Sequence, residues 1–161
     1  MRVKTKKILT TVAIGLASCL LIAQFITIRR TNPPLKGDLA APSQIKSLLR
    51  EACYDCHSNE TRWPWYTYVA PVSWLIEYDV ERGRQELNFS EWGSYYPATR
   101  LRKLQWMDRA LREETMPRWK YRVLHPGASL TPEGLAALGQ WIESEIAGQT
   151  QRKPENREDS K

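Results

Sequence analysis

The chain has 161 residues, of which 24 are Lys or Arg and 18 are Asp or Glu, giving a net charge of +6. Residues 1–30 contain six basic side chains and no acidic one, so the charge of the rest of the chain is balanced. A balanced body argues against a nucleic-acid partner, which needs a basic surface on the folded domain. Three Cys exclude a disulfide-stapled scaffold, and a charged fraction of 26% with seven Trp excludes a wholly disordered chain, so we expect a compact globule.

Residues 1–30 are predicted to form a membrane anchor. Within them, residues 8–28 contain no charged side chain, and about 21 helical residues span about 30 Å, the thickness of a hydrocarbon core. The basic cluster before this stretch is heavier than the Arg29-Arg30 pair after it, which predicts a cytoplasmic N-terminus and an exported body. We therefore expect a single-pass protein of the bacterial inner membrane whose folded domain lies in the periplasm.

The N-terminal segment has two alternative interpretations. An ordinary signal peptide would be cleaved, although its apolar stretch is usually shorter and is followed by polar sequence. The tetrapeptide Leu16-Ala17-Ser18-Cys19 resembles a lipoprotein processing box, in which Cys19 would carry the lipid. Both alternatives, like the anchor, place the body outside the cytoplasm.

The exported part begins with a Pro-rich linker and a helix. Residues 31–42 contain three Pro and one Gly, so they are expected to form an extended tether. Ser43 is the predicted N-cap, and apolar residues at helical spacing predict a helix of roughly ten residues that runs into Cys53. Residues 59–74 are rich in Trp and Tyr and interrupted by Pro, which indicates irregular packed chain.

Three more helices are predicted. A short one is expected at 73–85, and an amphipathic one at 98–114, where Leu and Met recur at every third or fourth position. Thr131 is the predicted N-cap of a last helix that ends near Ala147, and residues 148–161 are expected to form a disordered polar tail. No segment alternates in the manner of a strand, so the predicted fold class is all-α.

The C-x-x-C-H sequence of residues 53–57 carries the chemistry. It is the signature of covalent c-type haem attachment. Two thiols one helical turn apart can add to the two vinyl groups of one porphyrin edge, so Cys53 and Cys56 are the predicted thioether residues. His57 then offers its imidazole to the iron as the proximal ligand. The predicted cofactor is one covalent haem c.

Three haem-free interpretations of the same residues are weaker. A thioredoxin-like redox pair normally follows a strand, and no strand is predicted here. A zinc site could combine Cys53, Cys56 and His57 with His125, but the sequence offers no second close pair of ligands. A structural Cys53–Cys56 disulfide would close a very small loop and leave His57 without a role.

Further short motifs follow the C-x-x-C-H sequence. They are Ser58-Asn59-Glu60-Thr61, Trp63-Pro64-Trp65-Tyr66, Pro71-Val72-Ser73-Trp74, Asn88-Phe89-Ser90-Glu91-Trp92, Met116-Pro117 and His125-Pro126. On these motifs the chain resembles the haem-binding-domain family of bacterial single-haem cytochromes, which is related to class I cytochromes c. The resemblance implies a small cytochrome c-like helical domain, here residues 43–147, in which the helix before Cys53 packs against the last helix.

The second axial ligand decides the function. The resemblance favours Met116, which precedes Pro117 just past a predicted helix end and therefore lies on a loop. Met107 is interpreted as a core residue because it lies on the apolar stripe of its helix. His125 is the alternative ligand, and an open position is the remaining possibility. A Met and His pair raises the reduction potential and suits an electron carrier.

Two other groups of residues have two interpretations each. Aromatic side chains between the motif and the next helix either wall the haem or form the core of a small domain: they are Trp63, Trp65, Tyr66, Tyr68 and Trp74. A basic run either binds haem propionates or an acidic partner, or is a solvated helix face: it consists of Arg100, Arg102, Lys103, Arg109 and Arg112.

These observations predict a membrane-anchored single-haem c-type cytochrome that passes single electrons between redox partner proteins and has no catalytic residues. The alternative is a haem enzyme or ligand sensor, peroxidase-like or gas-binding, with an open sixth position. The sequence identifies neither the electron donor nor the acceptor.

Overall fold

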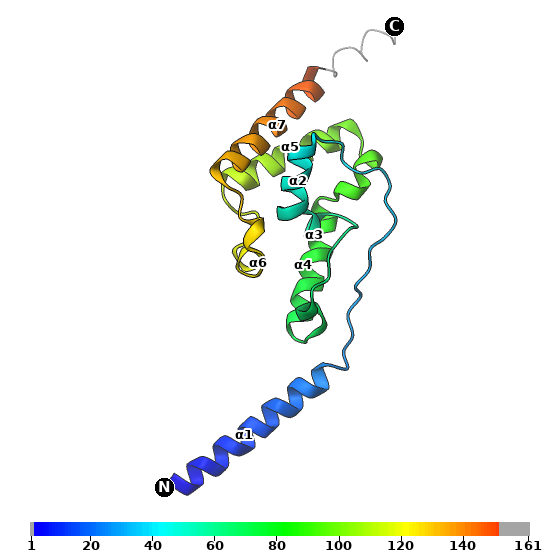
Figure 1. Cartoon of the computed structure of the whole chain (residues 1–161). Helices are drawn as coiled ribbons and strands as arrows, with labels where there is room; N and C mark the ends of the chain where they lie inside the picture. Colours follow the sequence, from blue (N-terminus) through cyan, green and yellow to red (C-terminus); the bar gives the residue numbers. More distant parts are fainter. Residues whose placement is uncertain (1, 152–161) are drawn as a thin grey trace.

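A computed structural model describes residues 2–151 of the chain (Figure 1). This part contains helices and no strand, which confirms the predicted all-α class. In chain order the elements are α1 (Arg2–Ala23), α2 (Ser43–Ala52), α3 (Tyr54–His57), η1 (Trp65–Tyr68), α4 (Val72–Glu86), η2 (Phe89–Ser94), α5 (Pro97–Arg112), α6 (Trp119–Leu124), η3 (Pro126–Ala128) and α7 (Pro132–Gln151). Figure 1 shows α1 projecting alone from a body that the other elements build.

α1 is long and apolar enough to cross a membrane, and its apolar side chains are exposed along its length. It ends at Ala23, earlier than the predicted residue 28. The next three backbone N–H groups donate to carbonyls only three residues back, at 3.0–3.2 Å, and the Gln24 amide donates to the Leu20 carbonyl at 2.8 Å. The helix therefore tightens into a 3₁₀-type turn and ends where Gln24 interrupts the apolar stretch.

The Pro-rich segment between α1 and α2 is extended, as predicted, but its second half is docked on η2. Leu39 N–H donates to Phe89 O at 3.0 Å, and Gly93 N–H donates to Gly37 O at 2.8 Å. Gly37 has a φ of +100°, and a Cβ added to it would lie 2.9 Å from Gly93 Cα. The left-handed backbone and the close approach explain why glycine occupies this position.

Helices α2, α5 and α7 surround the main hydrophobic core. The implied contact between the helix before Cys53 and the last helix is confirmed, because α2 packs on α7. Gly134 of α7 makes room for Leu48 of α2, since an added Cβ would lie 3.2 Å from the Leu48 side chain. The core consists of Leu39, Ile45, Leu49, Tyr54, Phe89, Trp92, Leu104, Met107, Leu111, Leu138, Trp141 and Ile142.

One of the two predicted helix caps is wrong and the other is confirmed. Pro42 occupies the N-cap position of α2, and Ser43 is the first helical residue and does not cap. Pro42 suffices because its carbonyl accepts the Lys46 N–H at 2.8 Å, which closes the first turn. At α7, the Thr131 hydroxyl accepts the Gly134 N–H at 3.1 Å, as predicted.

The longer predicted helices are confirmed to within a few residues. The stretches at 73–85 and 98–114 correspond to α4 and α5. α7 continues to Gln151, so residues 148–151, predicted to belong to the tail, are helical. Residues 152–161 of the predicted tail lie outside the described residues. The short α3, α6 and 3₁₀ turns were not predicted, because one or two turns carry no readable periodicity.

The C-terminal end of α5 contains a residue in a costly conformation. Glu114 has a φ of +51°, in the left-handed region that costs an L-residue about 1–2 kcal/mol. We expect Glu114→Gly to raise the free energy of unfolding by about 1 kcal/mol, less the extra entropy of glycine in the unfolded chain. Thermal unfolding in detergent, followed by circular dichroism, measures the change. The matched control is Glu113→Gly, where φ is −86°, and this variant should lower the free energy of unfolding. Equal changes in the free energy of unfolding at both positions would show that the Glu114 backbone is not strained.

Candidate functional site

The C-x-x-C-H sequence forms α3, one helical turn that directly follows α2 and packs on α4. The N–H groups of Cys56 and His57 donate to the Cys53 carbonyl at 3.2 and 2.9 Å, so the motif closes its own turn. His57 Nδ1 lies 2.9 Å from Gly83 O and 3.1 Å from Leu87 O, at the C-terminal end of α4. Two carbonyl acceptors require Nδ1 to carry the proton, which leaves Nε2 with a free lone pair. Burial also lowers the pKa of His57, so the imidazole is neutral, as a metal ligand must be.

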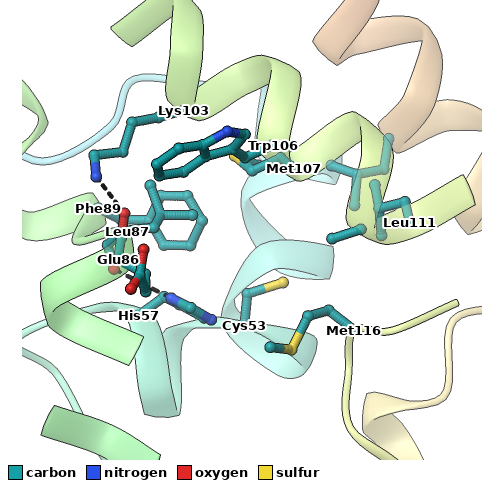
Figure 2. Close-up of a pocket in the computed structure, with 12 residues that line it drawn as sticks. Cys53, His57, Glu86, Leu87, Phe89, Lys103, Trp106, Met107, Leu111 and Met116 are labelled. Atoms are coloured by element: carbon teal, nitrogen blue, oxygen red, sulfur yellow. Dashed lines mark hydrogen bonds between the residues drawn. The ribbon is translucent and has the colours of Figure 1, made fainter. Parts of the chain in front are cut away.

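His57 and Cys53 line an apolar cavity of about 160 Å³, beside α5 and α7. Figure 2 shows the Cys53 thiol and the Met116 thioether on the side of the imidazole away from its backbone bond. The wall consists of Cys53, His57, Glu86, Leu87, Phe89, Lys103, Trp106, Met107, Ala110, Leu111, Met116 and Leu138.

Two methionines line this cavity, from different kinds of element. Met107 comes from the middle of α5 and belongs to the hydrophobic core. Met116 comes from the irregular loop between α5 and α6, just past the left-handed turn at Glu114. In Figure 2 its side chain extends toward His57. Met116 is therefore the thioether that lies on a loop and opposite the imidazole.

His125, the predicted alternative ligand, lies outside the cavity. Its Nε2 is 2.9 Å from the Tyr66 hydroxyl and its Nδ1 is 3.1 Å from Tyr121 O. The imidazole also stacks on the Tyr121 ring, with the centroids 4.0 Å apart. Because both ring nitrogens have partners, the geometry disfavours His125 as a second axial ligand.

The two thiols of the motif have different surroundings. Cys53 lines the cavity, whereas Cys56 packs on α4, where a Cβ added to Gly83 would lie 3.2 Å from Cys56 Cβ. Neither forms a disulfide. Burial raises the pKa of both Cys53 and Cys56 to about 12, whereas a thiol redox pair needs a lowered pKa. The surroundings therefore disfavour the thioredoxin-like interpretation.

The zinc interpretation also lacks a ligand set. His125, the proposed fourth ligand, is held by Tyr66 and Tyr121 instead of by the motif. Among residues 2–151, no group of three or more His, Cys, Asp or Glu side chains is arranged to hold a metal ion. The motif therefore offers one imidazole and two separate thiols, which is not a tetrahedral zinc site.

The aromatic residues predicted to wall the haem lie away from this cavity. None of the five lines it: they are Trp63, Trp65, Tyr66, Tyr68 and Trp74. They precede α4 or lie in its first turn, and Trp65 is 78% exposed, whereas His57 binds at the far end of that helix. The aromatic part of the wall comes instead from Phe89 of η2 and Trp106 of α5. Phe89 belongs to a motif that carried the resemblance, but Trp106 lies off the apolar stripe of its helix and gave no signal.

The predicted basic run is divided between the cavity and the surface. Lys103 lines the cavity, its ammonium group donates to the Glu86 carbonyl, and it lies 5.4 Å from the centroid of the Trp106 ring. Burial lowers the pKa of Lys103. Arg112 instead pairs with carboxylates of α5 and α7, and Arg100 donates to backbone carbonyls. Lys103 is the member of the run that could meet an acidic group of a bound cofactor.

A buried polar cluster fixes the loop that follows α3. Asp55, 6% exposed, accepts hydrogen bonds from Arg62 Nε at 3.1 Å and from the Tyr121 hydroxyl at 2.6 Å. The Asn88 amide donates to Asn59 Oδ1 at 2.8 Å. These bonds join α3 to α6 and η2, so the family motif after His57 has a structural role. In the sequence, Asn59 and Asn88 contribute only to the family resemblance, and nothing singles out Arg62 or Tyr121.

Comparison with known proteins agrees with the chemistry of this cavity. The family profile described as "Haem-binding domain" matches residues 18–144, more than half of the chain. Cytochrome c peroxidase Ccp of Escherichia coli (strain K12) is 27% identical over 112 residues, which are 65% of this chain and 23% of that protein. The chain thus spans less than a quarter of the length of this relative. No solved structure matches the chain.

Proposed function

The chain belongs to the haem-binding-domain family, and on that premise we propose that it is a membrane-anchored single-haem c-type cytochrome that transfers single electrons in the periplasm. One observation carries the proposal: the Cys53 thiol, the His57 imidazole and the Met116 thioether meet at one apolar cavity. The cavity fits a haem, because its wall is apolar, its imidazole is neutral and oriented, and Lys103 can meet a propionate.

Each residue has a role in this proposal. Cys53 and Cys56 would hold haem c covalently, and His57 and Met116 would ligate its iron. When bound, the haem supplies an iron centre that changes oxidation state by one electron. The backbone carbonyls that accept from His57 Nδ1 fix the ring orientation and strengthen it as a donor. A bound Met116 thioether would raise the reduction potential, and with His57 and Met116 both bound the iron would have no exchangeable position for a substrate.

The N-terminal helix supports the anchored part of the proposal. Lys4–Ala23 is apolar enough to span a bilayer, and the heavier positive flank precedes the apolar stretch. By the positive-inside rule the N-terminus stays in the cytoplasm and the haem domain is exported. Its electron donor and acceptor are then redox proteins that reach the outer side of the inner membrane.

Acid-acetone extraction tests the covalent attachment. We expect the protein, made in a host with haem maturation machinery, to keep a c-type reduced spectrum after extraction. The double variant Cys53→Ser/Cys56→Ser should lose essentially all haem, because no thioether link is left. Cys19→Ser is the matched control, since Cys19 lies in α1 and outside the cavity. Complete extraction of haem from the wild-type protein would contradict the c-type assignment.

A haem enzyme is the second candidate, because the relative is named a cytochrome c peroxidase. A peroxidase-like centre needs a position on the iron that a substrate can enter, whereas Met116 lies at this cavity. We therefore expect the reduced protein not to bind carbon monoxide without denaturation, as judged from its absorption spectrum. Rapid carbon monoxide binding together with peroxide turnover would favour the enzyme.

A further inference from the structure

The end of the body that lies next to α1 carries a group of exposed apolar side chains. Trp65 is 78% exposed, Tyr68 60% and Leu75 59%, and Val69 and Val72 lie between them in the chain. We call these five residues the η1–α4 patch. Residues 65–75, which carry the patch, contain no charged side chain, and exposed apolar side chains grouped in this way usually mark an interaction site.

The segment that carries the η1–α4 patch is joined to the end of α1 by hydrogen bonds at Ala70 and Trp74, which are neighbours of the patch residues in the chain. The Gln24 side-chain amide donates to Ala70 O at 3.2 Å, and its Oε1 accepts the Ala70 N–H at 3.0 Å. Trp74 Nε1 donates to Ile26 O at 3.4 Å. Figure 1 shows the same arrangement, with the C-terminal end of α1 near the N-terminal end of α4. The patch therefore lies beside the C-terminal end of α1.

The residues that follow α1 also have exposed apolar side chains. Phe25 is 86% exposed and Ile26 is 59% exposed, and both follow directly after α1. Neither belongs to the core of the body. Phe25 and Ile26 therefore add two exposed apolar side chains next to Gln24, which is bonded to Ala70 beside the patch.

Basic side chains border this surface on the side of the body. The Arg30 guanidinium lies 4.0 Å from the centroid of the Tyr68 ring and donates to Thr67 O at 3.0 Å. Arg29 N–H donates to Glu77 at 2.7 Å, and its side chain is exposed. Trp and Tyr rings beside basic side chains are the usual composition of a chain at the headgroup level of a bilayer.

We propose that the η1–α4 patch is a membrane-docking surface that lies in the interfacial layer of the bilayer and holds the haem domain against it. The inference rests on the proposed anchoring by α1. If α1 crosses the bilayer, its last residue lies at the interface, and the residues bonded to Gln24 lie at the same depth. The aromatic rings can then remain partly hydrated while the aliphatic side chains enter the acyl boundary.

Spin labels on the full-length holoprotein in lipid vesicles test this surface. In a Cys19→Ser background, a nitroxide is attached to Trp65→Cys or Leu75→Cys, and its accessibility to oxygen and to a water-soluble nickel chelate is compared. Ala147→Cys is the matched control, because Ala147 is exposed on α7, at the other end of the body in Figure 1. A ratio of the two accessibilities at one site cancels the relaxation caused by the haem iron.

We expect both patch labels to give an oxygen-to-nickel ratio about twofold or more above that of Ala147→Cys, as for side chains roughly 5–10 Å into the boundary. Equal ratios in protein that the vesicles retain would overturn the docking surface and leave the anchor intact. Protein that the vesicles release without detergent would overturn the anchor and the docking surface together.

Discussion

Met116→Ala is expected to abolish the weak far-red sulfur-to-iron absorption band of the oxidised protein and to lower its reduction potential. The thioether favours ferrous iron, so its loss should shift the potential by on the order of 0.1–0.3 V, within the range of about 0.8 V that axial ligands set. Potentiometric titration and the far-red spectrum measure both effects. The variant should also gain carbon monoxide binding, because the chain no longer fills the sixth position.

Met107→Leu is the matched control, since it removes the other thioether that lines the cavity and keeps the volume of a core side chain. It should leave the far-red band unchanged. A band that survives Met116→Ala and disappears in Met107→Leu would show that the core methionine is the ligand. A band that survives both substitutions would exclude methionine ligation from either position.

Gly83→Ala is expected to weaken the haem site and the fold together. A Cβ at Gly83 would lie 2.4 Å from the Cys56 carbonyl oxygen and 3.0 Å from its carbonyl carbon. Both are backbone atoms, so α4 has to move away from α3 and weaken the bond from His57 Nδ1 to Gly83 O. The overpacking should lower the free energy of unfolding by about 1–3 kcal/mol, with about 1 kcal/mol more from the hydrogen bond. Denaturant titrations followed by circular dichroism, together with haem content, measure the loss.

Gly139→Ala is the matched control for this substitution. Gly139 lies in α7, and an added Cβ would meet no other atom within 4 Å. Alanine is the better helix former, so this variant should gain about 0.5–1 kcal/mol. If Gly83→Ala matched that gain and kept its haem, α4 would not pack on the motif as closely as described.

Residues whose role depends on local sequence could be predicted. The turn of Cys53, Cys56 and His57 follows from three positions in one helical turn, and α5 follows from a repeat of apolar residues. The placement of Met116 on a loop follows from Pro117, which stops a helix from continuing. These parts of the fold and site can be inferred without knowing which distant residues pack against them.

Residues brought together from distant parts of the chain could not be predicted. The acceptors of His57 Nδ1 are backbone carbonyls of Gly83 and Leu87, and any residue type carries such a carbonyl. Trp65 and Trp106 have the same side chain, but the packing of α4 and α5 leaves the first outside the cavity and brings the second to its wall. Composition alone does not distinguish the two.

The docked linker limits how far the haem domain can travel. A free twelve-residue linker over 31–42 would allow a reach of about 17–21 Å, enough to search for a partner. Here the connecting chain is bonded to the body at Gln24, Asn32 and Leu39, where Asn32 Nδ2 donates to Thr61 O at 2.9 Å. If the chain is anchored and transfers electrons as proposed, the domain moves only with its anchor, and the frequency of electron exchange is set by the diffusion of its partners and by its own lateral diffusion in the bilayer.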